Sequence, residues 1–445
     1  MQIIAHNDTY CITSDKRGEG TYGAVYVGHL KNDPTTQLAF KQLKQPDKLS
    51  GLIQHTNIRE ATFLSEMRDM LTLQENPFVP LIDIVLGDLL TTQNEELKQS
   101  LIIVMPLYQL ELSKLLDSNM IQDFDLKHLL LIVMKLFSLV AKMHQLNFAH
   151  RDLKHNNIMA MQNWKFSIID FGMVQYNPDV LIQQTYENEE VSNLNNEQNT
   201  FDLRSSTITA LSWRPPEQYF SKAQLQEPHN VSILKQLNNG FKSDSYVLGI
   251  MILEFLLGLL VYRPKQPEDE GGLAEVIAMH FYISEYCQEN KHLIKNSVNK
   301  TQILEHLNQL NSSQFQSFDN AVSWCRISYH KLILKSLLIR FYKELNEENV
   351  NVIKKLADLI VDLTQFDCLQ RLEVDQLIKK YPEFYINDET EANLQLEKDC
   401  GQLGNPPKKT KMTMIQNFEE LGGKLKGFVF KCVEGLESEE IKKWM

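Results

Sequence analysis

The chain has 445 residues, of which 43% are hydrophobic, 23% charged and 9% aromatic, which is the composition of a folded globular protein and excludes a disordered or fibrous one. Its net charge of -12 argues against general binding to the nucleic-acid backbone, because that binding depends on clustered Lys and Arg. The first residues lack the charged and then apolar pattern of a secretory signal, so we expect the chain in the cytoplasm and/or nucleus.

The first hundred residues read as short strands interrupted by one helix. Strands are predicted over 24–30, 38–43 and 101–105, where β-formers stand between turn residues. Apolar residues recur at three- and four-residue steps over 58–73, which predicts an amphipathic helix.

From about residue 110 onward the pattern becomes helical. A helix is predicted over 126–144, and 246–262 is an apolar run interrupted by Glu254 and two glycines. A membrane-spanning helix needs roughly 20 apolar residues without charge, so this run predicts the central helix of a helical unit and no membrane partner. The polar stretch 183–200 predicts a loop, either a regulatory site or a tolerated surface insertion.

A glycine-rich run opens the functional motifs. The segment Gly18-Glu19-Gly20-Thr21-Tyr22-Gly23-Ala24-Val25 fits the pattern GxGxxGxV, in which glycines let the backbone approach phosphates without an intervening Cβ. The same glycines could serve a dinucleotide turn, but that turn leads into a helix. Because β-formers follow Gly23, the run favours a strand-loop-strand cover over a nucleotide.

A lysine and a glutamate follow at the spacing of a nucleotide site. Lys41 lies in a predicted strand, where its ammonium could pair with phosphate oxygens, although a lone strand lysine is more often simply exposed. Glu60, on the predicted helix, supplies a carboxylate that could hold Lys41 in place. This pairing is the lysine-to-helix ion pair of protein kinases.

The segments His150-Arg151-Asp152-Leu153-Lys154-His155-Asn156-Asn157 and Asp170-Phe171-Gly172 carry the chemistry of phosphoryl transfer. Asp152 can accept or orient a hydroxyl proton, and Lys154 can neutralise charge on the moving phosphoryl group. Asn157 and Asp170 offer the hard oxygen ligands that Mg²⁺ prefers.

Taken in order, these motifs resemble those of a eukaryotic Ser/Thr protein kinase over residues 8–385. The resemblance implies an α+β, bilobal kinase fold with a small β-rich N-lobe over 8–105, one regulatory helix and a larger helical C-lobe over 106–385. It also implies an activation segment over 170–217, and it leaves 386–445 as a tail of unassigned role.

Within the kinases, the chain is most similar to the cyclin-dependent kinase group. The likeness rests on the run from Gly18 to Tyr26, on Thr56-Asn57-Ile58-Arg59-Glu60 and on Trp213-Arg214-Pro215-Pro216-Glu217. It implies ATP and Mg²⁺ as cofactors, protein substrates, and a cyclin-type regulatory subunit as a partner. Arg214 matches an arginine typical of proline-directed kinases, which implies a proline after the acceptor residue.

The resemblance also implies a role for each matching position. The ATP-binding residues are Gly18, Gly20, Gly23, Val25, Ala39, Lys41, Met105, Leu107, Tyr108, Glu111 and Met159. The catalytic residues are Asp152, Lys154, Lys41 and Glu60, and the metal ligands are Asn157 and Asp170. Regulatory roles fall on Arg59, Arg151, Ser205 and Thr207, and structural roles on Asp244 beneath the catalytic loop and on Glu217 paired with Arg371.

Four positions depart from the family pattern. Ala210 replaces a residue that is usually threonine, Gln175 replaces an arginine that often grips the phosphorylated loop, and His155 replaces the common proline of the catalytic loop. Tyr246 replaces the usual tryptophan after Asp244, and neither it nor His155 removes a reacting group. Ala210, however, lacks a hydroxyl that in the family normally bonds to the catalytic aspartate and lysine. These departures leave two alternatives open, a nucleotide-binding pseudokinase or scaffold and a related kinase that needs no partner.

Overall fold

The computed structural model describes the residues 3–6, 9–19, 23–43, 51–71, 77–88, 99–117, 120–176, 215, 239–258, 329–330, 333–338, 340–365, 368 and 370–403. The chain divides into two compact units. The first comprises 1–112, 156–175 and 393–405, and the second 113–155, 176–392 and 406–445.

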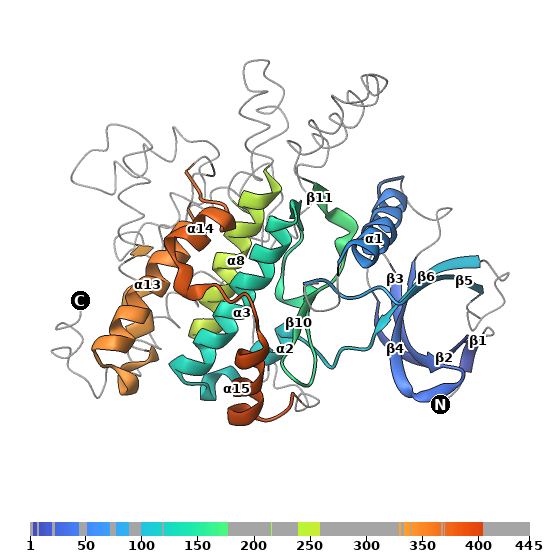
Figure 1. Cartoon of the computed structure of the whole chain (residues 1–445), viewed down its shortest axis with the longest axis horizontal. Helices are drawn as coiled ribbons and strands as arrows, with labels where there is room; N and C mark the ends of the chain where they lie inside the picture. The colour runs from blue at the N-terminus through green and yellow to red at the C-terminus, as the bar shows by residue number, and fades with distance from the viewer. Residues whose placement is uncertain are drawn as a thin grey trace, which may run out of the picture. The chain divides into compact units, whose positions relative to one another are not determined.

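A six-stranded antiparallel sheet, in the order β1-β2-β3-β4-β6-β5, forms most of the first unit (Figure 1). Its strands are β1 (Ile3–His6), β2 (Tyr10–Glu19), β3 (Gly23–Leu30), β4 (Asp33–Leu43), β5 (Asp83–Asp88) and β6 (Gln99–Pro106). The strands expected over 24–30, 38–43 and 101–105 are therefore present as β3, β4 and β6, each somewhat longer.

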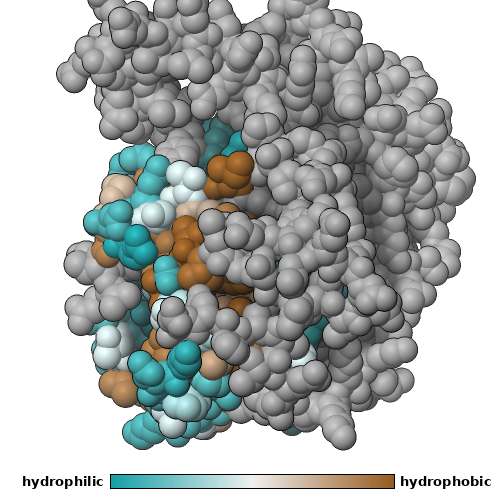
Figure 2. Space-filling model, turned by 90° about the vertical axis from the view of Figure 1, so that its right-hand side faces the viewer, coloured by the Kyte–Doolittle hydropathy of each residue, from teal (hydrophilic) through white to brown (hydrophobic). Residues whose placement is uncertain are grey.

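The two faces of this sheet differ in their side chains because successive residues of a strand point to opposite sides. Along β4, Leu38 and Phe40 enter an apolar cluster, whereas Ala39 and Lys41 take the other face. The cluster comprises Tyr10, Ile12, Leu38, Phe40, Ile102 and Val104. Figure 2, which presents the side on which the sheet lies, shows a band of apolar side chains bordered by hydrophilic ones.

A helix and a smaller sheet also belong to the first unit. Helix α1 (Gly51–Met70) corresponds to the helix predicted over 58–73, but it begins seven residues before the predicted start and ends three residues before the predicted end. The smaller sheet contains β7 (Leu110–Glu111), β9 (Ile158–Ala160) and β10 (Phe166–Ile168), with β7 and β10 on either side of β9. Because β9 pairs with β7, this hairpin belongs to the first unit, although the sequence placed it in the C-lobe.

The second unit is mostly helical. Its described helices are α2 (Leu112–Asp117, whose first residue is counted in the first unit), α3 (Leu126–Gln145), α8 (Gly240–Leu257), α13 (Glu347–Leu363) and α14 (Val374–Lys380). The remaining short elements of the described chain are β8 (Phe148–Ala149), β11 (Gln175–Tyr176) and the 3-10 helices η2 (Met120–Asp123), η3 (His155–Asn157), η4 (Phe171–Met173), η9 (Tyr342–Glu344) and η10 (Pro382–Phe384). Asp125 begins α3 by accepting a hydrogen bond from the backbone N–H of His128.

Helix α8 is buried on every side except at Lys242, as expected for an apolar helix at the centre of a helical unit. It packs against α3, α13 and α14. Gly249 permits the close approach of α13, because a Cβ there would lie 2.7 Å from Leu363 Cβ. The helix ends at Leu257, before Gly258, whose φ of 65° is left-handed. Within the described part of the chain, no helix is both long and apolar enough to cross a bilayer.

Residues 386–403, assigned from the sequence to a tail, are folded. The backbone N–H of Ile386 donates to Ser138 Oγ of α3, and Glu389 pairs with Lys135 and Lys142 of the same helix. Helix α15 (Thr390–Cys400) follows, and in the first unit the Trp164 indole donates to the carbonyl of Gly401. The basic stretch near residue 409 and the polar stretch 183–200 lie outside the described residues.

Candidate active site

Lys41, Glu60 and Asp170 come together in the first unit from strand β4, helix α1 and the Asp-Phe-Gly segment. Lys41 Nζ donates to both carboxylate oxygens of Glu60, at 2.8 and 2.6 Å, and to Asp170 Oδ1 at 2.9 Å. Such short contacts to two ionised groups are strong charge-assisted hydrogen bonds. The ammonium is therefore held in one place between helix α1 and the Asp-Phe-Gly segment.

Burial and charge shift the pKa values within this group in a consistent way. Burial alone would lower the pKa of Lys41, but the charges of Glu60 and Asp170 outweigh it and hold that pKa above its ordinary value. Burial raises the pKa of Glu60, the Asp170 charge adds to that shift, and Lys41 opposes it. One ammonium thus balances two carboxylates, and removing it would leave like charges facing each other.

The phenylalanine of the Asp-Phe-Gly segment is fixed by two aromatic rings that the sequence did not single out. Phe171 lies with its ring centroid 4.6 Å from that of Phe63 on α1 and 5.1 Å from that of Phe78. All three side chains are buried, at centroid distances typical of favourable aromatic pairs. Phe63 follows Glu60 by one helical step of three residues, a spacing that could have predicted it on the same face of α1.

Asn157 and Asp170 offer a donor set that suits Mg²⁺. The backbone N–H of Ile169 donates to the Asn157 carbonyl oxygen at 2.9 Å, which brings the two candidate ligands to neighbouring positions across the β9–β10 hairpin. An amide oxygen and a carboxylate are hard ligands of the kind Mg²⁺ takes together with phosphate oxygens. No cluster of three or more His, Cys, Asp or Glu side chains that could hold a metal alone occurs among the described residues.

The residues expected around the base of ATP lie on paired strands of the same unit. Val25 of β3 stands opposite Lys41 on β4, and Ala39 of β4 stands opposite Met105 on β6. Met159 of β9 pairs with Glu111 of β7. Met105 and Ala39 are buried, and Leu107, just after β6, is half-buried.

Two of these residues make hydrogen bonds that limit their roles. The buried hydroxyl of Tyr108 donates a hydrogen bond to Ser167 Oγ at 2.8 Å. Because its side chain is used in this contact, we expect its backbone, rather than its hydroxyl, to bind the base of ATP. Burial raises the pKa of the Tyr108 hydroxyl. Glu111 accepts a hydrogen bond from Asn156 at 3.1 Å, which orients its carboxylate.

The glycines expected to approach the ATP phosphates differ in the space around them. A Cβ on Gly23 would lie 2.2 Å from the Gln42 carbonyl oxygen of β4, so strand packing itself requires glycine there. A Cβ on Gly18 would meet nothing within 4 Å. Gly20 lies outside the described residues.

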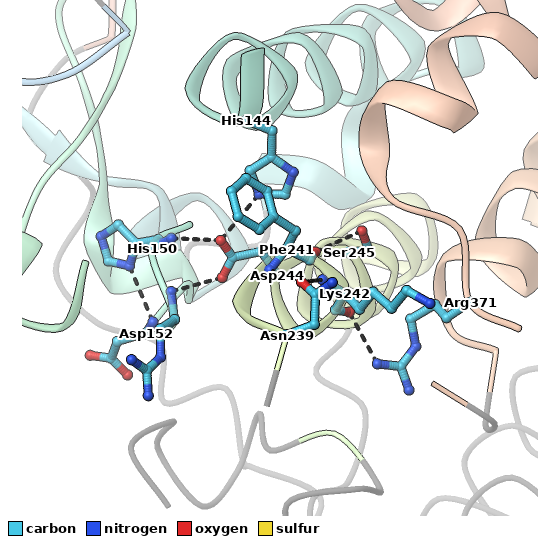
Figure 3. Close-up of polar contacts among 10 residues, drawn as sticks. His144, His150, Asp152, Asn239, Phe241, Lys242, Asp244, Ser245 and Arg371 are labelled. Carbon is cyan, nitrogen blue, oxygen red and sulfur yellow. Dashed lines mark hydrogen bonds and ion pairs between the residues drawn. The ribbon is translucent and has the colours of Figure 1, made fainter. Parts of the chain in front are cut away.

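In the second unit, Asp244 at the start of α8 accepts the backbone N–H groups of the His-Arg-Asp segment (Figure 3). Its carboxylate oxygens lie 2.6 Å from the His150 nitrogen and 2.8 Å from the Arg151 nitrogen. His144 of α3, a residue missed from the sequence, contacts the same carboxylate at 3.2 Å. Asp244 is buried, and it holds Arg151 at a φ of 68°, which a non-glycine residue rarely adopts.

Asp152 and Lys154 are paired directly. Lys154 Nζ donates to Asp152 Oδ2 at 2.6 Å, and the Asp152 backbone N–H donates to His150 Nδ1 at 3.2 Å. Asp152 is thus a carboxylate oriented from both its side chain and its backbone. An acceptor of a hydroxyl proton needs this kind of fixed orientation.

The regulatory and structural candidates are only partly described. Arg59 is half-buried on α1 and Arg151 is buried. Arg371 is buried over the ring of Tyr246 and donates to the carbonyl oxygens of Gln365 and Lys242. Ser205, Thr207 and Glu217 lie outside the described residues, as do the departure Ala210 and the matching Arg214.

Comparison with known proteins places residues 12–381 in a protein kinase domain family. Cyclin-dependent kinase 12 of Caenorhabditis elegans is 27% identical over 169 residues, which cover 38% of this chain and 22% of that protein. Serine/threonine-protein kinase ppk23 of Schizosaccharomyces pombe is 31% identical over 162 residues, 36% of each chain. Cyclin-dependent kinase 12 of Drosophila melanogaster is 30% identical over 165 residues, 36% of this chain and 13% of that protein.

The aligned segments are thus between 13 and 36% of the length of these curated relatives. A solved structure of the CAK complex from Chaetomium thermophilum bound to ATP-γ-S matches with a TM-score of 0.49 and 17% identity, covering 84% of this chain and 90% of that one.

Proposed function

The chain belongs to the protein kinase family, and on this premise we propose that it transfers the γ-phosphoryl group of ATP to Ser or Thr residues of protein substrates. The observation that carries the proposal is the contact of Lys41 with both Glu60 and Asp170. Phosphoryl transfer depends mainly on positioning and on stabilising charge, and an ammonium fixed by two carboxylates meets both needs.

In the proposed reaction, the substrate hydroxyl oxygen forms a bond to the γ-phosphorus while the bond to the β–γ bridging oxygen breaks and ADP leaves. Asp152 accepts the hydroxyl proton, and Lys154, at 2.6 Å from it, offsets the charge of the moving group. Lys41 orients the phosphates. Asn157 and Asp170 would hold Mg²⁺, which would offset the negative charge of the phosphates.

We further propose a cyclin-dependent type of kinase, with a cyclin-type subunit as partner and a proline after the acceptor residue. Support comes from the Gly18 to Tyr26 run and from the similarity to two cyclin-dependent kinases. The proposed location is the cytoplasm and/or nucleus.

Transfer of phosphate from Mg-ATP to a randomised Ser/Thr peptide library tests the activity, with Asp170→Asn as the blank. Transfer by the wild type that is lost in the variant supports the proposal, and the enriched flanking residue reads out the preference for proline. If the wild type is inactive alone but active with cell extract, a partner is required. Inactivity under both conditions would favour the pseudokinase alternative.

A further inference from the structure

His155 and Glu254 form a polar pair that is sealed inside the second unit. His155 Nε2 lies 2.6 Å from Glu254 Oε2, and the two side chains are 1% and 0% exposed. The imidazole also packs edge-on against Phe255, at a centroid distance of 5.0 Å and an interplanar angle of 79°. A carboxylate buried to this degree needs a hydrogen-bonding partner, because an unpaired buried charge is strongly unfavourable.

The pair lies at the downstream end of the segment that carries Asp152 and Lys154. Asp244 of α8 already holds the upstream end by accepting the N–H groups of His150 and Arg151. Glu254 belongs to the same helix, more than two turns further along, and contacts His155 in η3. A single buried helix therefore supplies one carboxylate to each end of the catalytic segment.

We propose that Glu254 and His155 are positioning residues that fix the downstream end of the catalytic loop for phosphoryl transfer. The resembled kinases commonly have proline where His155 stands, and a proline ring fixes φ by itself. Histidine does not restrict φ in this way, so the backbone at residue 155 needs another restraint. The hydrogen bond to Glu254 supplies it. This inference rests on the proposed kinase activity.

The test compares Glu254→Leu, which removes the acceptor, with Glu254→Gln, which keeps an oxygen for the imidazole at nearly the same size. We expect Glu254→Leu to lower kcat about ten- to a hundredfold, as small misplacements of catalytic groups do, with the KM for ATP changed less than twofold. Glu254→Gln should retain kcat within about threefold. The double variant His155→Pro/Glu254→Leu should recover most of the loss, because proline restores a restraint and leucine fills the space of the glutamate.

Glu389→Gln is the matched control. It disrupts a partly buried ion pair of the second unit, with the buried Lys135, but touches no residue of the catalytic segment. It should lower the melting temperature and leave kcat unchanged. An equal loss of kcat in Glu389→Gln and Glu254→Leu would overturn the positioning role, as would an unchanged kcat in Glu254→Leu.

Hydrogen exchange of the peptide spanning residues 150–157, followed by mass spectrometry, gives a readout that does not need activity. Exchange should be faster in Glu254→Leu than in the wild type, and unchanged in Glu389→Gln. If exchange responds in this way while the wild type transfers no phosphate even with cell extract, the loop restraint stands and the proposed function fails. If exchange does not respond, the restraint itself is wrong.

Discussion

Lys135, fully buried on α3, lies 2.6 Å from a carboxylate oxygen of Glu389 in the segment leading into α15. Lys142, further along α3, contacts the other oxygen of the same carboxylate at 3.3 Å. Glu389 stands beyond residue 381, where the match to the protein kinase domain family ends. The chain just after the family domain is therefore tied into the second unit by a buried charge.

We expect Glu389→Ala to lower the free energy of unfolding by about 3 kcal/mol, because it leaves the Lys135 ammonium buried without this carboxylate. The double variant Lys135→Met/Glu389→Leu should lose much less, since it buries no charge. Urea denaturation of the full chain measures both values. A single variant as stable as the wild type would mean that the pair does not hold residues 386–389 in solution.

Substituting Lys41→Met should make the stability of the first unit depend more strongly on pH than it does in the wild type. Without the ammonium, burial and the Asp170 charge raise the pKa of Glu60 further above its ordinary value. A carboxyl group whose pKa is raised on folding stabilises the protein below its unfolded pKa and loses that contribution as the pH rises through its folded pKa. Each tenfold change in the acid constant is worth about 1.4 kcal/mol.

The melting temperature of Lys41→Met should therefore fall increasingly below that of the wild type as the pH rises above 4.5, the ordinary pKa of a glutamate. The variant Lys41→Met/Glu60→Gln is the control, because it lacks the carboxyl group and should show a nearly constant difference. Scanning calorimetry at several pH values measures both. A difference in melting temperature between Lys41→Met and the wild type that does not grow with pH would contradict repulsion between the Glu60 and Asp170 carboxylates in the variant.

The motif residues could be predicted from the sequence because each motif places its residues at a characteristic spacing along the chain. Lys41, Glu60 and Asp170 were chosen by spacing along the chain, and the structure brings all three within hydrogen-bonding distance. Glu254 was visible only as a charge that interrupted an apolar run, since its partner His155 lies 99 residues away in the sequence. Contacts at such separation depend on helix packing, which a periodic pattern does not encode.

Short and polar elements could not be predicted from the sequence, for a different reason. Strands β7, β9 and β10 contain two or three residues each, too few to display an alternating pattern. Helix α15 has a composition typical of an exposed tail, yet Leu396 is fully buried. Tertiary contacts, not local preference, fix these segments.

Asp244→Ala should be among the most damaging substitutions in α8. It removes the acceptor for two backbone N–H groups, at 2.6 and 2.8 Å, and leaves Arg151 without support for its left-handed backbone. Each buried donor left unsatisfied costs about 1–3 kcal/mol. We expect a loss of several kcal/mol in unfolding free energy and, under the proposed function, the loss of measurable kcat.

Ser245→Ala is the neighbouring control for Asp244→Ala. Ser245 is equally buried, and the hydrogen bond of its hydroxyl goes to the Phe241 carbonyl within the same helix at 2.9 Å. Chemical denaturation should therefore place its cost near 1 kcal/mol or below. Similar losses of unfolding free energy in the two variants would contradict a specific stabilising role of the Asp244 hydrogen bonds.

Substitutions at Gly18 and Gly23 should affect different properties: the first the binding of nucleotide, the second the stability of the fold. Gly23→Ala forces a Cβ to within 2.2 Å of the Gln42 carbonyl oxygen, so β3 and β4 must move apart where Gly23 pairs with Leu43, two residues along β4 from Lys41. We expect a fall in unfolding free energy of about 1–3 kcal/mol, the usual cost of overpacking. Gly18→Ala places its Cβ in open space and should leave the melting temperature within about a degree of the wild type. Any effect of Gly18→Ala should appear as weaker binding of Mg-ATP, measured by calorimetric titration, and a marked loss of stability in Gly18→Ala would contradict this division of roles.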